Sequence, residues 1–207
     1  MKHVVLLGDS IFDNASYVGA GPDVQDQLAG LLTQPSQVTL LAQDGALIAG
    51  AVSQLERLPP PATHLVVSAG GNDALELSGI LDEGASSVAD CMQMLSAVAG
   101  LFGRNYSKML DAVLKPALPA AVCTIYDPRF REPRRSVAAA ALTLLNDRII
   151  REAFARGVAV LDLRLICDHD EDFATEIEPS IRGGAKIAAG IARFVNGAPS
   201  SCVIAKP

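Results

Sequence analysis

The chain has 207 residues, half of them hydrophobic, which is enough to form one domain around a substantial core. Its 23 acidic and 17 basic residues give a net charge of −6, which argues against nucleic acid or an anionic membrane as the main partner. The apolar content and the absence of any low-complexity tract exclude an intrinsically disordered chain.

The sequence also argues against a metal site and a secreted location. Its cysteines are far apart and show no zinc-site spacing: Cys91, Cys123, Cys167 and Cys202. We therefore expect neither a metal nor another cofactor. The first apolar run is too short for a signal peptide, and no stretch is long enough to span a membrane. These features predict a cytoplasmic protein with reduced cysteines.

Five apolar segments predict the strands of a sheet. They lie at roughly 3–8, 37–42, 63–69, 120–126 and 157–163. Each is rich in Val, Leu or Ile, and none alternates cleanly with polar residues. Continuous apolar strands are typical of a sheet that is covered on both faces, with parallel strands joined by helical crossovers.

The segments between these strands show the apolar spacing of amphipathic helices. We expect helices near 24–32, 48–55, 136–155 and 181–195, the last with Ser180 as its N-cap. The stretch 86–114 predicts one long helix or two abutting ones. Strand–helix alternation of this kind indicates a three-layer α/β/α sandwich. We expect a single domain over 1–198 and a loosely attached tail over 199–207.

Polar residues and a glycine follow four of the predicted strands: Ser10, Gly45, Asn72 and Asp127. Ligands of open parallel sheets bind beyond the carboxyl ends of the strands, so these residues should converge at one edge. The segment 74–87, which follows the third strand, is long enough to help form a substrate rim.

Three short blocks carry a resemblance to a known family. They are Gly8-Asp9-Ser10, Asp44-Gly45-Ala46 and Gly70-Gly71-Asn72-Asp73. In this order and spacing they resemble the nucleophile, glycine and asparagine blocks of the SGNH/GDSL hydrolases. The resemblance implies a flavodoxin-like fold with a five-stranded parallel sheet, and hydrolysis of esters, thioesters or related acyl compounds.

Acyl transfer needs a nucleophile and donors for the developing oxyanion. The resemblance makes Ser10 the nucleophile, although an Asp-Ser pair can also simply cap a turn. The oxyanion donors would be the backbone N–H groups of Ser10 and Gly45 and the side-chain amide of Asn72. Gly45 could instead only supply a turn. Asp9 and Asp73 are expected to hold their loops through backbone hydrogen bonds.

The base departs from the family pattern. Where the family usually has Asp-x-x-His-Pro, this chain has Thr175-Glu176-Ile177-Glu178-Pro179, so Glu178 replaces the histidine. The alternative base is His169, which lies in an acidic loop after the fifth strand. A glutamate with its ordinary pKa of ~4.3 would keep the enzyme active in acid unless burial raised that pKa. Arg182, one helical turn on, would lower the pKa if it paired with Glu178.

Together these residues predict a serine acyl hydrolase, esterase- or lipase-like, that acts on a small acylated substrate. Two alternatives stay open on the sequence. The altered fourth block favours a catalytically silent relative that binds an acylated ligand or a protein partner. An acyltransferase could use the same site, because a sequence does not distinguish water from another acceptor. The sequence gives no indication of an oligomeric state.

Overall fold

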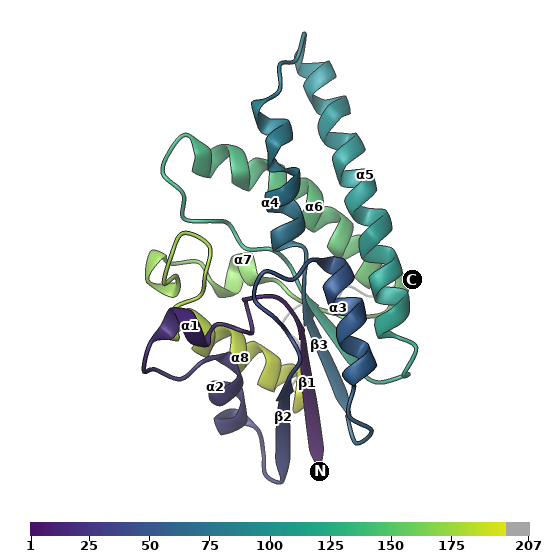
Figure 1. The fold of residues 1–207 in the computed structure, drawn as a ribbon, viewed down its shortest axis with the longest axis vertical. Coiled ribbons are helices and arrows are strands. Elements are labelled where there is room, and N and C mark those ends of the chain that lie inside the picture. The colour runs from purple at the N-terminus through teal and green to yellow at the C-terminus, as the bar shows by residue number, and fades with distance from the viewer. Residues whose placement is uncertain (198–207) are drawn as a thin grey trace.

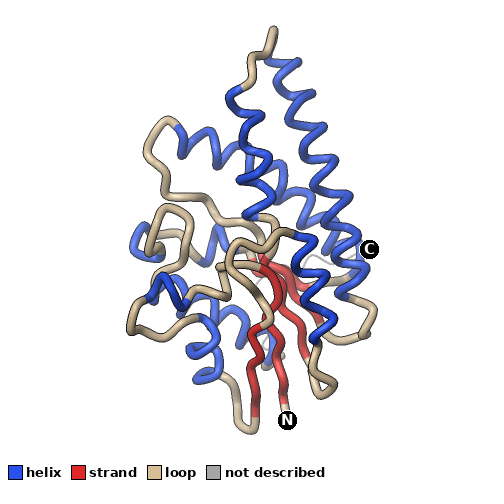
Figure 2. Tube along the Cα trace, viewed as in Figure 1, coloured by secondary structure: helices blue, strands red, loops and turns tan. Residues whose placement is uncertain are grey.

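The chain forms a sheet of five parallel strands in the order β2-β1-β3-β4-β5 (Figures 1 and 2). The computed structural model describes residues 1–197. The strands are β1 (Lys2–Gly8), β2 (Ser36–Leu40), β3 (His64–Ser68), β4 (Ala120–Cys123) and β5 (Ala159–Leu161). The chain moves outward from β1 to β2 and then crosses back to β3, so the strand order reverses between β1 and β3. Such a reversal is where flavodoxin-like sheets bind their ligands.

The central strands are buried on both faces, which explains their continuous apolar sequences. In β1, Val5 and Leu7 belong to one core, whereas Val4 and Leu6 belong to the other. The same alternation holds in β3, where Leu65 faces the first core. A strand sends successive side chains to opposite faces, so each central strand contributes to both layers.

Helices cover both faces of the sheet. The structure has α1 (Ala15–Val18), α2 (Val24–Leu31), α3 (Ile48–Gln54), α4 (Gly71–Leu77), α5 (Val88–Val113), α6 (Arg134–Arg156), α7 (Leu163–Ile166) and α8 (Ile181–Val195), with 3-10 turns η1 (Leu55–Arg57), η2 (Ser78–Asp82) and η3 (Asp170–Asp172). Helices α3, α5 and α6 contribute to the first core. Helices α2, α7 and α8 contribute to the second. The predicted α/β/α sandwich is therefore confirmed.

Part of the first helical layer extends beyond the carboxyl edge of the sheet. Helix α4, η2 and the first half of α5 project past the strand ends, and the start of α6 lies beside them (Figure 1). Helix α5 is one continuous helix of 26 residues, and its buried residues begin only at Ala99. Its N-terminal half therefore lies off the sheet and is free to form a wall above the strand ends.

The predicted elements match the observed ones closely. All five strands and all five helices occur, with shorter β4 and β5 than expected. The hydroxyl of Ser180 caps α8 by accepting the Gly183 N–H at 3.2 Å, as predicted. No helix in residues 1–197 is long and apolar enough to cross a membrane. The predicted tail at 199–207 lies outside the described residues.

Candidate active site

Ser10 follows β1 at the point where the strand order reverses. Gly8 ends the strand with φ +120°, and a Cβ there would lie 1.6 Å from the Ser68 carbonyl oxygen. Only glycine permits this close approach of β1 to the end of β3. The turn continues through Asp9, whose carboxylate accepts the Ile11 N–H at 3.2 Å. This tight turn presents Ser10, which is nearly buried, at the carboxyl edge of the sheet.

The Ser10 hydroxyl donates a hydrogen bond to the Glu178 carboxylate, with 3.1 Å between Oγ and Oε1. The two residues are 168 positions apart in sequence, so the fold alone brings them together. The second carboxylate oxygen, Oε2, is buried and has no hydrogen-bond partner among the described residues. A serine hydroxyl held on a buried carboxylate is an arrangement that can activate the oxygen as a nucleophile.

A set of local hydrogen bonds fixes the loop that carries Glu178. The Thr175 hydroxyl accepts the backbone N–H groups of Glu178 at 3.1 Å and of Ile177 at 3.2 Å. The Tyr126 hydroxyl donates to the Ile177 carbonyl at 2.6 Å. The Glu178 carbonyl in turn accepts the Ala174 N–H at 2.8 Å. Thr175, at the position of the family's aspartate, therefore holds the loop of the carboxylate rather than a histidine ring.

The two other residues considered around the base lie in a separate ion-pair cluster. The Arg182 guanidinium contacts Asp172 at 3.2 Å and Glu171 at 3.9 Å. His169 is largely exposed, and its ring lies 3.8 Å from the Asp168 carboxylate. Neither residue lines the cavity beside Ser10. Arg182 therefore stabilises the acidic loop before Glu178 instead of pairing with Glu178.

The residues expected to form the oxyanion hole lie on neighbouring loops. Asn72, in the first turn of α4, donates its side-chain N–H to the Ala46 carbonyl at 3.0 Å. Gly45, with φ +75°, lies next to Ala46 in the loop after β2. Asp73 accepts the Ile48 N–H at 2.9 Å and so joins α4 to the start of α3, as a loop-holding residue should. Asn72 lines the cavity beside Ser10, whereas Gly45 does not and is linked to Asn72 only through Ala46, its neighbour in sequence.

Burial dominates the electrostatics of the site. It raises the pKa of Glu178 to about 7, with a further increase from the nearby Asp44 charge and an opposing effect from the Ser10 hydrogen bond. Burial also raises the pKa of Asp9 to about 7, against hydrogen bonds from Ile11 and Ser68. The ordinary glutamate pKa expected from the sequence is thus wrong for Glu178, because the side chain is removed from water. A base with a pKa near neutrality is well matched to proton transfer at physiological pH.

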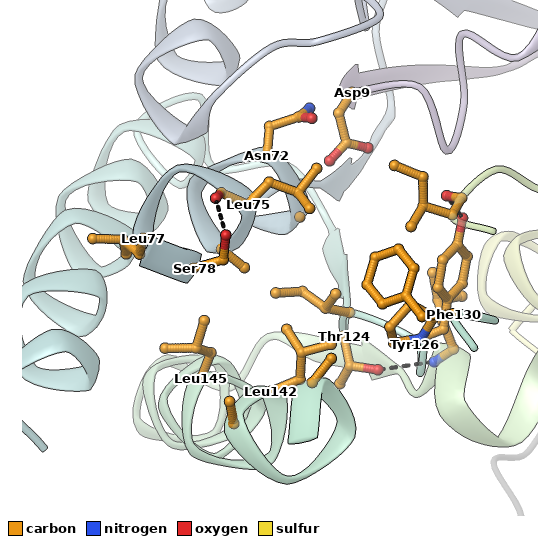
Figure 3. Close-up of a pocket in the computed structure, with 18 of the residues that line it drawn as sticks. Asp9, Asn72, Leu75, Leu77, Ser78, Thr124, Tyr126, Phe130, Leu142 and Leu145 are labelled. Carbon is orange, nitrogen blue, oxygen red and sulfur yellow. Dashed lines mark hydrogen bonds between the residues drawn. The ribbon is translucent and has the colours of Figure 1, made fainter. Parts of the chain in front are cut away.

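A cavity of about 140 Å³ opens beside Ser10, Asn72 and Glu178. Figure 3 shows Asp9 and Asn72 on one side of it and Leu142 and Leu145, from α6, on the opposite side. The predicted rim at 74–87 contributes through Leu75 and its neighbours. The wall from α5 and α6 was not predicted, because the apolar stripes of these helices have the same spacing whether they face a core or a cavity.

The sequence matches one family over most of its length. A model of the GDSL-like Lipase/Acylhydrolase family matches residues 6–183. The chain belongs to this family. This SGNH/GDSL protein is therefore an ester hydrolase by class, with Ser10, Gly45, Asn72 and Glu178 all inside the matched range. No functionally curated protein matches the sequence.

Solved hydrolase structures share the fold over nearly the whole chain. The extracellular lipase of Streptomyces rimosus has a TM-score of 0.68 at 17% identity, covering 96% of this chain and 100% of the lipase. The lipase Lip_vut3 from a goat rumen metagenome has a TM-score of 0.71 at 16% identity, covering 94% and 97%. Est24, a carbohydrate acetylesterase from Sinorhizobium meliloti, has 0.68 at 12%, covering 95% and 99%.

The structural similarity to these proteins establishes the fold. At such low sequence identity it leaves open the substrate and the cellular location of this protein. The similar structures range from lipases to an acetylesterase, so the acyl group has to be inferred from the cavity of this chain. One of them is described as extracellular, and the cytoplasmic location stays a prediction.

Proposed function

We propose that this SGNH/GDSL protein hydrolyses acyl esters through a Ser10–Glu178 pair. The observation that carries the proposal is the 3.1 Å hydrogen bond from the Ser10 hydroxyl to the Glu178 carboxylate inside a cavity. Glu178 occupies the base position of the family, its loop is anchored by Thr175, and burial raises its pKa to about 7. These three properties are those required of a general base for a serine nucleophile.

The reaction follows from this pair in two halves. Ser10 Oγ bonds to the carbonyl carbon of the ester while its proton passes to Glu178 Oε1. The tetrahedral intermediate then loses the alcohol, which takes the proton from Glu178, and an acyl-Ser10 ester remains. Water attacks this ester as Glu178 accepts one of its protons. The second intermediate releases the carboxylic acid, and the proton returns to Ser10 Oγ.

The negative charge on the carbonyl oxygen needs hydrogen-bond donors near the Ser10 turn. We assign this role to the backbone N–H groups of Ser10 and Gly45 and to the side-chain amide of Asn72. The bond from Asn72 to Ala46 uses one of the two amide hydrogens and fixes the orientation of the group. The other hydrogen stays available to the oxyanion. Donors fixed in advance need no reorganisation during the reaction, which makes such stabilisation effective.

The test is covalent labelling with a fluorophosphonate, which reacts with activated serines. We expect the label on the Ser10 peptide of the wild-type protein and no label on Ser10→Ala. The exposed Ser16 provides the matched control, so Ser16→Ala should label like wild type. A protein that stays unlabelled, or that labels equally after Ser10→Ala, contradicts the proposal and favours a silent relative that only binds its ligand.

A further inference from the structure

The cavity beside Ser10 has two chemically different parts. The catalytic side chains Ser10, Asn72 and Glu178 lie at the strand ends. Away from them the cavity is lined by residues of α4, η2, α5 and α6. Figure 3 shows Leu77 of α4 on one side and Leu142 and Leu145 of α6 on the other. The wall residues that matter here are apolar: Leu77, Ile80, Leu95, Val98, Leu142 and Leu145. We call this group the helical wall.

The few hydroxyl groups around the helical wall already have partners within the protein. The Ser78 hydroxyl donates to the Leu75 carbonyl at 2.7 Å. The Thr124 hydroxyl donates to Asp162 at 2.9 Å and accepts the Leu163 N–H at 2.9 Å. A sugar or a peptide in this part of the cavity would lose hydrogen bonds to water without gaining new ones, which costs free energy.

Among the residues of α4, η2, α5 and α6 that line the cavity, the one charged side chain is Arg134, which lies outside the helical wall and is directed to the surface. Arg134 is exposed at the start of α6, and its guanidinium lies over the Phe130 ring, 4.5 Å from the centroid. It therefore contributes to the rim of the cavity and leaves the interior of the helical wall uncharged. An uncharged surface without free donors or acceptors is suited to hydrocarbon.

We propose that the helical wall binds the acyl chain of the substrate. The preferred substrates are then esters of unbranched apolar acids of butyryl length or longer, up to at least hexanoyl, rather than acetate esters. This inference rests on the proposed function, because the position of the acyl chain follows from the ester carbonyl carbon being bound at Ser10. An acetyl group would fill only the space next to Ser10 and leave the helical wall without contacts. Each further methylene exchanges water for apolar side chains, so longer chains gain affinity until the wall ends.

The experiment compares p-nitrophenyl acetate, butyrate and hexanoate as substrates. We expect kcat/KM to rise about fourfold for each added methylene, the gain from burying one such group. Ala141, on α6, also lines the cavity beside Leu142. Ala141→Phe therefore places a ring in the space meant for the acyl chain and should abolish this rise, while hydrolysis of the short acetate ester stays within about twofold of wild type. Ala140→Phe, on the exposed side of the same helix, is the matched control and should keep the wild-type profile.

A second variant protects the test against misfolding of the first. Val98→Phe fills the wall from α5, and Ala97→Phe is its exposed control. Acetate hydrolysed as fast as hexanoate, or wild-type profiles in both wall variants, overturns the acyl-chain proposal while Ser10 labelling still supports the mechanism. No hydrolysis of any ester, together with no label on Ser10, overturns the proposed function and this inference with it.

Discussion

The two sides of the cavity differ in how they are held together. The floor of the cavity, comprising Ser10, Asn72 and Glu178 with their loops, is fixed by hydrogen bonds between segments far apart in sequence. The helical wall is fixed by apolar packing, and α4, η2 and the first half of α5 extend beyond the sheet (Figure 1). Polar contacts define one geometry for the chemistry, whereas apolar packing tolerates changes of size. We therefore expect floor substitutions to change the rate and wall substitutions to change the choice of substrate.

The largest effect is expected from removing the base. Glu178→Gln preserves the shape of the side chain but cannot accept the Ser10 proton, so kcat should fall about 10²–10⁴-fold. In wild type, kcat/KM should decrease as the pH falls through about 7, because the base acts only as the carboxylate and burial raises its pKa to about 7. The residual activity of Glu178→Gln should no longer show this decrease, which forms the acidic limb of the pH profile. Rate measurements from pH 5 to 9 test both points.

A histidine would give a limb in the same pH range, so the pH profile alone does not identify the base. His169→Ala provides the control, and it should keep both the rate and the limb. A dead His169→Ala with an active Glu178→Gln would assign the role to the histidine and leave Glu178 as a structural residue before α8.

The second effect concerns the oxyanion. Asn72→Ala removes one fixed donor, which should reduce kcat about 10²–10³-fold. The chain-length profile should not change, because the helical wall is intact. A melting temperature within a few degrees of wild type would show that the loss is chemical. Retention of full activity would exclude Asn72 from the oxyanion hole, and unfolding would show that its bond to Ala46 is structural.

The third effect is smaller and concerns positioning. Thr175→Val removes the acceptor for the Glu178 and Ile177 N–H groups, so the carboxylate should lie less firmly against Ser10. We expect kcat to fall about tenfold, because small displacements of catalytic groups reduce the rate. KM for a hexanoate ester should be unchanged and Thr175→Ser should restore kcat. A variant with normal kcat, or one that alters KM alone, would contradict this role.

The sequence predicted the sheet and its layers because buried parallel strands have continuous apolar sequences. The short blocks after β1, β2 and β3 were visible in the sequence because they serve local geometry, whereas the need for glycine at Gly8 is shown only by the structure. Thr175 and Glu178 could be placed only through the resemblance to the family. The roles of Ser10, Gly45, Asn72 and Glu178 stay predictions until the experiments above are made.

Other properties depend on contacts that no local pattern encodes. The raised pKa of Glu178 comes from burial by segments distant in sequence. Arg182 was considered beside Glu178 because the two are four residues apart, yet Asp172 competes for it across the start of α8. The α6 stripe of Leu142, Leu145 and Ile149 matched a core pattern, and only the structure shows that its first two residues also line a cavity.

The smallest effect concerns the stability of the folded protein. The floor contains a buried titratable group, Asp9, whereas the helical wall contains none, so only the floor should make stability depend on pH. Burial raises the pKa of Asp9 to about 7, whereas an unfolded chain releases this proton near ~4. The folded protein therefore binds the proton more tightly than the unfolded chain. Its stability should be highest below pH 4 as far as this group is concerned, decrease as the pH rises to about 7, and stay constant above.

Asp9→Asn cannot ionise and keeps an oxygen that can accept the Ile11 N–H, so it should remove this cost. We expect its melting temperature to exceed that of wild type by on the order of 5 °C at pH 8 and to equal it at pH 4. Glu56→Gln, at an exposed acid, should show the same small effect at both pH values. A wall variant such as Ala141→Phe should likewise shift the melting temperature equally at both, because the helical wall carries no titratable group. A lower melting temperature for Asp9→Asn than for wild type at pH 8 would contradict this prediction. The ionised Asp9 carboxylate would then stabilise the Ser10 turn, and its burial would not lower the stability of the folded protein at that pH.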